Sequence, residues 1–170
     1  MVNDLKAVTI YTDGACSGNP GRGGYGVVLI YGDQRKELAG GFRLTTNNRM
    51  EIIAALTGLQ ILKQRCAVKL YTDSRYVVDS ITKGWAKRWR AKDWKMPGGG
   101  VRPNADLWLR LLAECARHDV QFLWVRGHAS NRENNRCDEL AVQAARGGDL
   151  PVDSGYAETK TAVGTPGLFA

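Results

Sequence analysis

Alternation of hydrophobic and polar residues predicts five short strands in this chain. They cover residues 8–14, 25–31, 37–42, 68–73 and 120–125. Val8 and Ile10 set the alternation in the first strand, which we expect to end in a turn at Gly14. A turn at 32–34 joins the second strand to the third, so the first three strands should form an antiparallel meander.

Apolar residues at helical spacing fill the intervals between these strands. Within residues 50–62 they recur every three or four positions, which is typical of a helix that packs on a sheet. Residues 45–48 offer several N-caps for it. Further helices are expected over 75–82 with Ser74 as cap, after Asn104 as cap, and over residues 134–146.

Two of the strands end in the same tripeptide, Tyr-Thr-Asp, which places Asp13 and Asp73 at strand ends. If these strands are parallel neighbours, the two carboxylates meet at the carboxyl edge of the sheet, where open α/β sheets bind ligands. Two carboxylates there would repel each other unless a cation lay between them.

Two more acids, Glu51 and Asp138, lie near helix starts. Each alone also fits a simpler interpretation, as a negative charge that complements the positive N-terminus of a helix. Small residues one and two turns after Glu51 would let its helix approach the sheet closely. Four acids without histidine or cysteine ligands suit Mg²⁺ or Mn²⁺ rather than zinc. Two such ions about 3.5–4 Å apart can activate a water and stabilise the leaving oxygen of a phosphate.

The net charge of +7 favours a polyanionic partner, either nucleic acid or an anionic membrane surface, and it is concentrated in one segment. Residues 83–102 hold seven basic residues and one acid, which together account for +6. Trp85, Trp89 and Trp94 lie among them. Cations that neutralise phosphates, with rings that stack on sugars or bases, favour nucleic-acid binding. The alternative is a solvated basic helix whose rings at 85 and 89 pack inward.

Two loops could contact a ligand. The glycine-rich connection at 14–24 fits equally a plain hairpin loop and a backbone that approaches a ligand closely. His128 follows Gly127 at the end of the last strand, and a histidine beside acids can carry protons. The default interpretation of a lone loop histidine is a solvated side chain.

The length of 170 residues suits one domain, and residues 147–170 form a tail rich in Gly, Pro, Ser and Thr. We expect the tail to be flexible, with order only where Tyr156 or Phe169 finds a groove. No apolar run approaches membrane-spanning length and the four cysteines are scattered, so we expect a cytoplasmic protein that binds no membrane.

Several motifs occur in the order and spacing of one known family. They are Tyr11-Thr12-Asp13-Gly14, Gly18-Asn19-Pro20-Gly21, Thr46-Asn47-Asn48-Arg49-Met50-Glu51, Tyr71-Thr72-Asp73-Ser74, Gly127-His128-Ala129 and Glu133-Asn134 through Arg136-Cys137-Asp138. On these motifs, roughly residues 5–146 closely resemble bacterial ribonuclease H of type 1.

The resemblance implies an α/β fold, a ribonuclease H-like five-stranded mixed sheet of three antiparallel strands then two parallel ones, with helices on both faces. Residues 1–146 would form the catalytic domain, with a basic protrusion at about 83–102. The implied activity is endonucleolytic hydrolysis of the RNA strand of RNA/DNA hybrids by a two-metal in-line mechanism, leaving 5′-phosphate and 3′-hydroxyl ends. Two Mg²⁺ ions, replaceable by Mn²⁺, would bind with the substrate, and the enzyme would be a monomer.

Individual positions match the family's functional residues. The metal ligands would be Asp13, Glu51, Asp73 and Asp138, with His128 as the mobile histidine that assists proton transfer or product release. Contacts to the RNA strand and its 2′-hydroxyls would come from Cys16, Gly18, Asn19, Asn47 and Asn48. The DNA strand would be held by Thr46 and Asn104 at a phosphate and by Trp85 at a deoxyribose, with Ser74 and Trp89 as further contacts. Arg75 departs from the family's usual glutamine, which puts that minor-groove contact in doubt.

Two other functions compete with this interpretation. A transposase or resolvase of the same superfamily would share the acids but act on DNA alone, and the residues suited to a 2′-hydroxyl argue against it. A hybrid-binding module without catalysis would gain nothing from carboxylates placed near phosphates.

Overall fold

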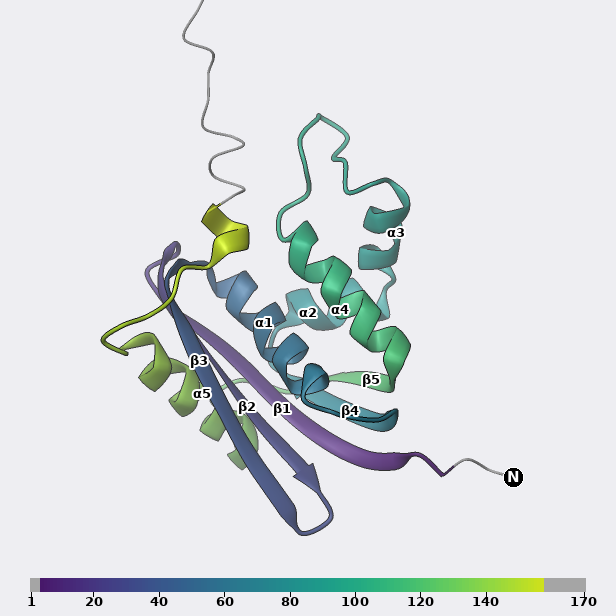
Figure 1. Ribbon diagram of the computed structural model, residues 1–170, viewed down its shortest axis with the longest axis vertical. Coiled ribbons are helices and arrows are strands. Elements are labelled where there is room, and N and C mark those ends of the chain that lie inside the picture. Colours follow the sequence, from purple (N-terminus) through teal and green to yellow (C-terminus); the bar gives the residue numbers. More distant parts are fainter. Residues whose placement is uncertain (1–3, 158–170) are drawn as a thin grey trace, which may run out of the picture.

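The computed structural model describes residues 4–157, and a five-stranded mixed sheet forms its centre (Figure 1). The strands are β1 (Lys6–Ser17), β2 (Gly21–Tyr31), β3 (Gln34–Thr45), β4 (Cys66–Thr72) and β5 (Asp119–Trp124). They lie in the order β3-β2-β1-β4-β5, with β1, β2 and β3 antiparallel and with β4 and β5 parallel to β1. The predicted sheet is therefore confirmed.

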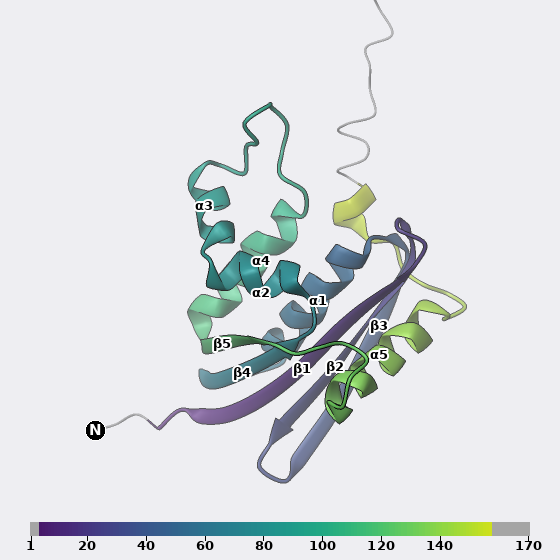
Figure 2. The same cartoon turned by 180° about the vertical axis from the view of Figure 1, so that it is seen from behind.

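Helices cover both faces of this sheet (Figures 1 and 2). They are α1 (Asn47–Gln60), α2 (Arg75–Thr82), α3 (Trp85–Ala91), α4 (Ala105–Arg117) and α5 (Arg132–Ala145). Successive residues of a strand point to opposite faces, and two glycines of β2 show which helix lies on each. A side chain at Gly23 would meet Met50 of α1, whereas one at Gly24 would meet Ala141 of α5.

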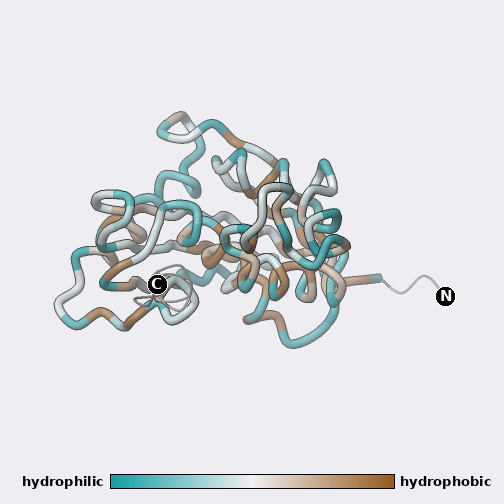
Figure 3. Tube along the Cα trace, turned by 90° about the horizontal axis from the view of Figure 1, so that it is seen from above, coloured by the Kyte–Doolittle hydropathy of each residue, from teal (hydrophilic) through white to brown (hydrophobic). Residues whose placement is uncertain are grey.

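The hydrophobic core lies mainly between the sheet and the helices α1 and α4. Ile10 and Leu70 from the strands, Leu59 from α1 and Trp108 from α4 are fully buried within it. Seen from above, hydrophobic residues gather in the interior and the peripheral loops are largely hydrophilic (Figure 3). Among residues 4–157, no helix has both the length and the apolar character needed to cross a membrane.

The sequence predicted that the first strand ends at Gly14, but the strand continues beyond this residue. It stays paired with β2 as far as Ser17, which lies opposite Arg22, so only a short turn separates the two strands. Glycine is required at position 14 because α1 passes directly over it. A Cβ there would lie 2.6 Å from the backbone of both Met50 and Glu51. The glycine therefore marks a close helix approach, and any ligand contact by this loop remains a prediction.

Two helices have the N-cap hydrogen bonds that the sequence predicted, and a third does not. The Thr46 hydroxyl accepts a hydrogen bond from the Arg49 N–H, and the Ser74 hydroxyl accepts one from the Val77 N–H. Asn104 precedes α4 but does not cap it with its side chain, because its backbone is left-handed with φ of 64°. Its amide instead donates to the Tyr76 hydroxyl at 3.2 Å.

The tail is ordered further than the sequence predicted. Pro151 accepts a backbone hydrogen bond from Arg43 in β3, and the Asp153 carboxylate is only 5% exposed. The prediction of flexibility missed this because Asp153 docks on charged and polar partners, which a search for apolar anchors does not find. Phe169, the other expected anchor, lies outside the described residues.

Candidate active site

Asp13 and Asp73 occupy matching positions on adjacent parallel strands. The pairing of β1 with β4 ends at Thr12 opposite Thr72, and each acid is the next residue. From this point β1 continues alongside β2 only. Neighbouring strands are about 4.8 Å apart, so the end of this pairing leaves two carboxylates at one edge of the sheet.

Glu51 reaches the same edge from α1. The close approach of this helix over Gly14 brings Glu51 down to the strand ends, where its side chain is buried with 5% exposure. One carboxylate oxygen from each of Asp13, Glu51 and Asp73 lies within 4.8 Å of the other two. The structure thus brings together three of the four predicted acids, from two strands and a helix.

Burial and mutual repulsion make this acidic cluster unfavourable without a cation. Burial, followed by the charges of Asp73 and Asp138, raises the pKa of Asp13 to about 8. Burial and the charge of Asp13 raise the pKa of Glu51 well above its usual value. Glu51 Oε2 is also buried and has no hydrogen-bond partner among the described residues. An unpartnered oxygen among three close carboxylates fits a divalent cation with oxygen ligands.

Asp138 and His128 lie beside this cluster. Asp138 is placed on α5 one residue after Cys137, whose thiol donates to the Tyr11 carbonyl at 3.2 Å. The Asp138 carboxylate is not among the three that lie within 4.8 Å of one another, but its charge raises the pKa of Asp13. Its Oδ2 lies 3.9 Å from Nδ1 of His128, whose side chain is 78% exposed. The fourth acid therefore connects the buried cluster to an exposed histidine.

Gly127 determines how closely the histidine loop approaches the acids. A Cβ at this position would collide with the Asp73 carboxylate. His128, the next residue in this loop, has an unusual backbone conformation with a positive φ of 52°. The sequence placed this glycine beside the histidine but gave no sign that it also faces Asp73.

Comparison with known proteins identifies the family of this chain. The family model described as RNase H matches residues 5–146. The chain belongs to the ribonuclease H family. It is 62% identical over 151 residues to a ribonuclease H of Syntrophus aciditrophicus, a match that covers 89% of this chain and 87% of that protein. It is also 62% identical over 156 residues to a ribonuclease H of Rippkaea orientalis, covering 92% and 96% of the two chains.

The fold agrees with this membership. The crystal structure of LC9-RNase H1, a type 1 RNase H with the type 2 active-site motif, superposes with a TM-score of 0.77 at 33% identity. The alignment covers 94% of this chain and 82% of that one. The predicted ribonuclease H assignment is therefore confirmed, and with it the prediction that the chain is an endoribonuclease.

The residues expected to contact RNA in this ribonuclease H gather around the β1–β2 turn and the start of α1. Gly18 has a positive φ of 78° in the turn, and the Cys16 thiol lies 3.5 Å from the Thr45 carbonyl. Asn19 Oδ1 accepts a hydrogen bond from the Asn47 N–H at 3.2 Å. This bond fixes the turn to the helix that carries Glu51. Asn48, in the same first turn of α1, is exposed.

The basic segment forms α3 and a turn closed by a bridge between Lys95 and Val101. It projects away from the sheet in both ribbon views (Figures 1 and 2). Trp89 packs at 5.9 Å between ring centroids against the buried Trp108, so inward packing accounts for this ring. Trp85 is half-buried with Lys83 over its ring at 5.3 Å. Substrate contacts by both rings remain predictions.

Arg75 and Trp124 form a stacked pair beside Asp73. The Arg75 guanidinium lies 3.8 Å from the centre of the Trp124 ring, and the indole N–H donates to the Asp73 carbonyl at 3.0 Å. The arginine that departs from the family pattern is therefore held beside the acids by a cation–π contact. Trp124 was predicted only as part of a strand.

No feature of the sequence indicates the ion pairs around Arg49. This guanidinium is 3% exposed and binds Asp106 through Nη1 and Nη2 and Asp153 through Nε and Nη2, at 2.7–3.0 Å. Its partners lie 57 and 104 positions away along the chain. No periodic pattern or short motif records such distant pairings.

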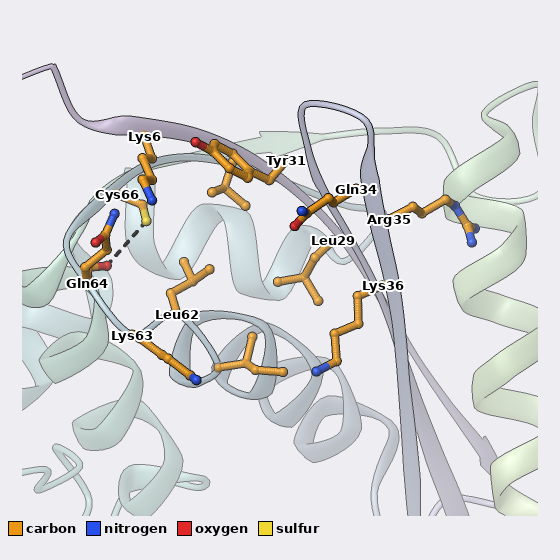
Figure 4. A pocket seen from close by; sticks show the side chains of 12 residues that line it. Lys6, Leu29, Tyr31, Gln34, Arg35, Lys36, Leu62, Lys63, Gln64 and Cys66 are labelled. Atoms are coloured by element: carbon orange, nitrogen blue, oxygen red, sulfur yellow. Dashed lines mark hydrogen bonds between the residues drawn. The ribbon is translucent and has the colours of Figure 1, made fainter.

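A cavity of about 820 Å³ lies at the end of the sheet opposite to the acidic cluster (Figure 4). Val8, Leu29 and Leu62 line it with apolar side chains, and Lys36 and Lys63 lie at its rim. None of the described residues that line this cavity is an acid, so they offer no carboxylate ligand for a divalent cation.

Proposed function

We propose that this ribonuclease H is a Mg²⁺-dependent endonuclease that hydrolyses the RNA strand of RNA/DNA hybrids, leaving 5′-phosphate and 3′-hydroxyl ends. The observation that carries the proposal is the convergence of Asp13, Glu51 and Asp73 within 4.8 Å, with one buried Glu51 oxygen lacking a partner. These three acids and Asp138 would hold two Mg²⁺ ions in a two-metal in-line reaction, and Mn²⁺ could substitute. Such ions, when bound, supply Lewis-acid stabilisation and an activated water at the phosphate.

The chain's own residues position the substrate and move a proton. Asp138 Oδ2 faces His128 Nδ1 at 3.9 Å, which leaves Nε2 as the nitrogen able to carry a proton at the cleaved bond. The exposure of His128 suits a side chain that exchanges protons with solvent. Asn19, Asn47 and Asn48 supply amide groups suited to 2′-hydroxyls, the feature that separates RNA from DNA.

The enzyme is proposed to act as a monomer in the cytoplasm. A single chain supplies every acid of the cluster. All four cysteines are free thiols, which is typical of a reducing compartment. Sedimentation analysis of the purified protein would test the monomer.

Cleavage of labelled duplexes by the Asp73→Asn variant tests the proposal. RNA/DNA hybrid, duplex DNA and duplex RNA are incubated with and without Mg²⁺. The parent should cut only the hybrid and only with Mg²⁺. The variant should cut at background level because a neutral amide is a poor Mg²⁺ ligand, while its affinity for the hybrid in EDTA stays within about twofold.

Asp79→Asn provides the matched control for this experiment. Asp79 belongs to α2 and pairs with Lys83 at 3.6 Å, outside the acidic cluster. It should cleave the hybrid at the parental rate. Cleavage by Asp73→Asn at the rate of the control would rule out the proposed metal-dependent reaction.

A further inference from the structure

The C-terminal segment, defined here as residues 150–157, returns to the end of the sheet where the β1–β2 turn and the start of α1 lie (Figure 1). Its short terminal helix is the yellow element in that view. Arg43 of β3 holds its first residues, with the N–H donating to the Pro151 carbonyl at 3.0 Å and Nε donating to the Leu150 carbonyl at 3.2 Å. This segment lies beyond the 5–146 range of the RNase H family model.

Buried ionic contacts hold the centre of the segment. Asp153 accepts two hydrogen bonds from the Arg49 guanidinium and one from the Thr45 hydroxyl, all between 2.7 and 3.0 Å. Gly155 then passes over the pair formed by Arg49 and Asp106 so closely that a Cβ would collide with both side chains. The contacts at Asp153 and Gly155 therefore fix the backbone that leads to Tyr156.

This path places Tyr156 in the wall of a cavity of about 280 Å³. The polar walls of the cavity come from Asn19, Thr46, Asn48 and Asn104, and Pro103 completes it with an apolar surface. Among residues 4–157, no carboxylate lines it. Amide and hydroxyl groups suit the oxygens of a phosphate, and an aromatic ring suits the flat face of a sugar.

The cavity adjoins the acidic cluster through α1. Asn48 and Glu51 are three residues apart on this helix, which corresponds to a rise of about 4.5 Å. On the other side, the Tyr76 hydroxyl accepts hydrogen bonds from the Asn104 amide at 3.2 Å and from the Trp108 indole at 3.0 Å, which fixes the Asn104 side chain. A hybrid whose DNA backbone is held in the cavity would therefore lie beside the cluster that is proposed to cleave its RNA strand.

We propose that the C-terminal segment is part of the substrate-binding surface, with the ring of Tyr156 packed against a deoxyribose of the DNA strand next to a phosphate held in the cavity. This inference rests on the proposed function, because it takes the RNA/DNA hybrid as the ligand. It adds to the binding surface a segment that the sequence assigned to a flexible tail.

Three variants test the inference: Tyr156→Ala removes the ring, Tyr156→Phe keeps it, and Tyr31→Ala removes an exposed ring at the far end of β2. Affinity for a fluorescent RNA/DNA hybrid is measured in EDTA, kcat and KM in Mg²⁺, and the melting temperature without substrate. Tyr156→Ala should weaken binding about five- to tenfold and raise KM similarly with kcat unchanged. The other two variants should stay within about twofold of the parent.

The outcomes separate this inference from the proposed function. If Tyr156→Ala binds the hybrid within twofold of the parent, the C-terminal segment is not a binding surface, whatever the cleavage rates are. A lower melting temperature with kcat reduced and KM unchanged would also overturn the inference, since that pattern indicates a structural role. If the parent binds the hybrid but does not cut it in Mg²⁺, the proposed function fails while the binding measurements still decide the role of Tyr156.

Discussion

Asp13 shows how folding turns an ordinary carboxyl into one that needs a cation. Its usual pKa of 3.8 rises to about 8 because the side chain is buried and faces the charges of Asp73 and Asp138. The folded protein therefore holds a proton that the unfolded chain releases above about pH 4. The contribution of this carboxyl to stability is complete at low pH and is lost as pH rises toward 8.

This linkage predicts how stability depends on pH without divalent ions. In EDTA, the free energy of unfolding should fall between about pH 4 and pH 8, and Asp13→Asn should reduce that fall by roughly 1–3 kcal/mol. Added Mg²⁺ should stabilise the parent more at pH 8 than at pH 5, because the ligands must be deprotonated to bind it. Urea denaturation at each pH measures both effects. Equal pH slopes for the parent and Asp13→Asn would contradict the prediction.

The acidic cluster depends on where whole elements begin, end and cross. The pairing of β1 with β4 stops at Thr12 and Thr72, and α1 crosses above at the one residue of β1 that has no side chain to obstruct it. Small movements of either element would separate the acids. The basic helix α3 carries none of these acids.

Exposed cations of α3 should contribute to hybrid affinity through phosphate neutralisation. Lys87 and Arg90 are both exposed on this helix, so replacing both with glutamine should leave the fold intact. The slope of the logarithm of the binding constant against the logarithm of salt concentration should fall in magnitude by roughly 1–2. Fluorescence anisotropy at several salt concentrations measures it in EDTA.

The distal cavity offers a control of equal charge. Lys36 and Lys63 line it at the opposite end of the sheet, and replacing both with glutamine lowers the net charge by the same amount. This pair should leave the salt slope close to that of the parent. Identical slopes for both double variants would show that overall charge, rather than the position of α3, drives binding.

At the scale of the whole molecule, Arg49 connects three distant parts of the chain. It joins α1 to Asp106 in α4 and to Asp153 in the C-terminal segment, and it is almost completely buried. A buried guanidinium with two carboxylates is costly to disrupt, because removing it leaves Asp153 buried without its cation.

Arg49→Met should therefore lower the free energy of unfolding by about 3–5 kcal/mol. Arg43→Met is the matched control, since Arg43 is exposed and its side chain bonds a single carbonyl, that of Leu150. The control should change stability by less than about 1 kcal/mol. Urea denaturation at pH 7 compares the two variants. A loss of similar size in both would mean that the ion pairs of Arg49 contribute little.

The sequence predicted those features that repeat locally or match a motif. Strand alternation and helix spacing predicted the five strands and the helices α1, α2, α4 and α5, and the repeated Tyr-Thr-Asp located Asp13 and Asp73. A helix at α3 was considered only as the alternative to a nucleic-acid-binding segment. The sequence could not locate contacts between segments far apart in the chain, such as Arg49 with Asp153. The prediction of a turn at Gly14 was wrong, because the local sequence around a glycine beneath a crossing helix resembles that around a glycine at the end of a strand.

The bond between Arg49 and Asp153 has a consequence for synthesis on the ribosome. Its two residues are 104 positions apart, so the Arg49 guanidinium gains this partner only after residue 153 has been translated. Until then the nascent chain also lacks Tyr156, which forms part of the cavity wall. A chain that stops just before Asp153 should therefore lose the buried partner of Arg49 together with the proposed Tyr156 contact, so its stability and its affinity for the hybrid should fall together.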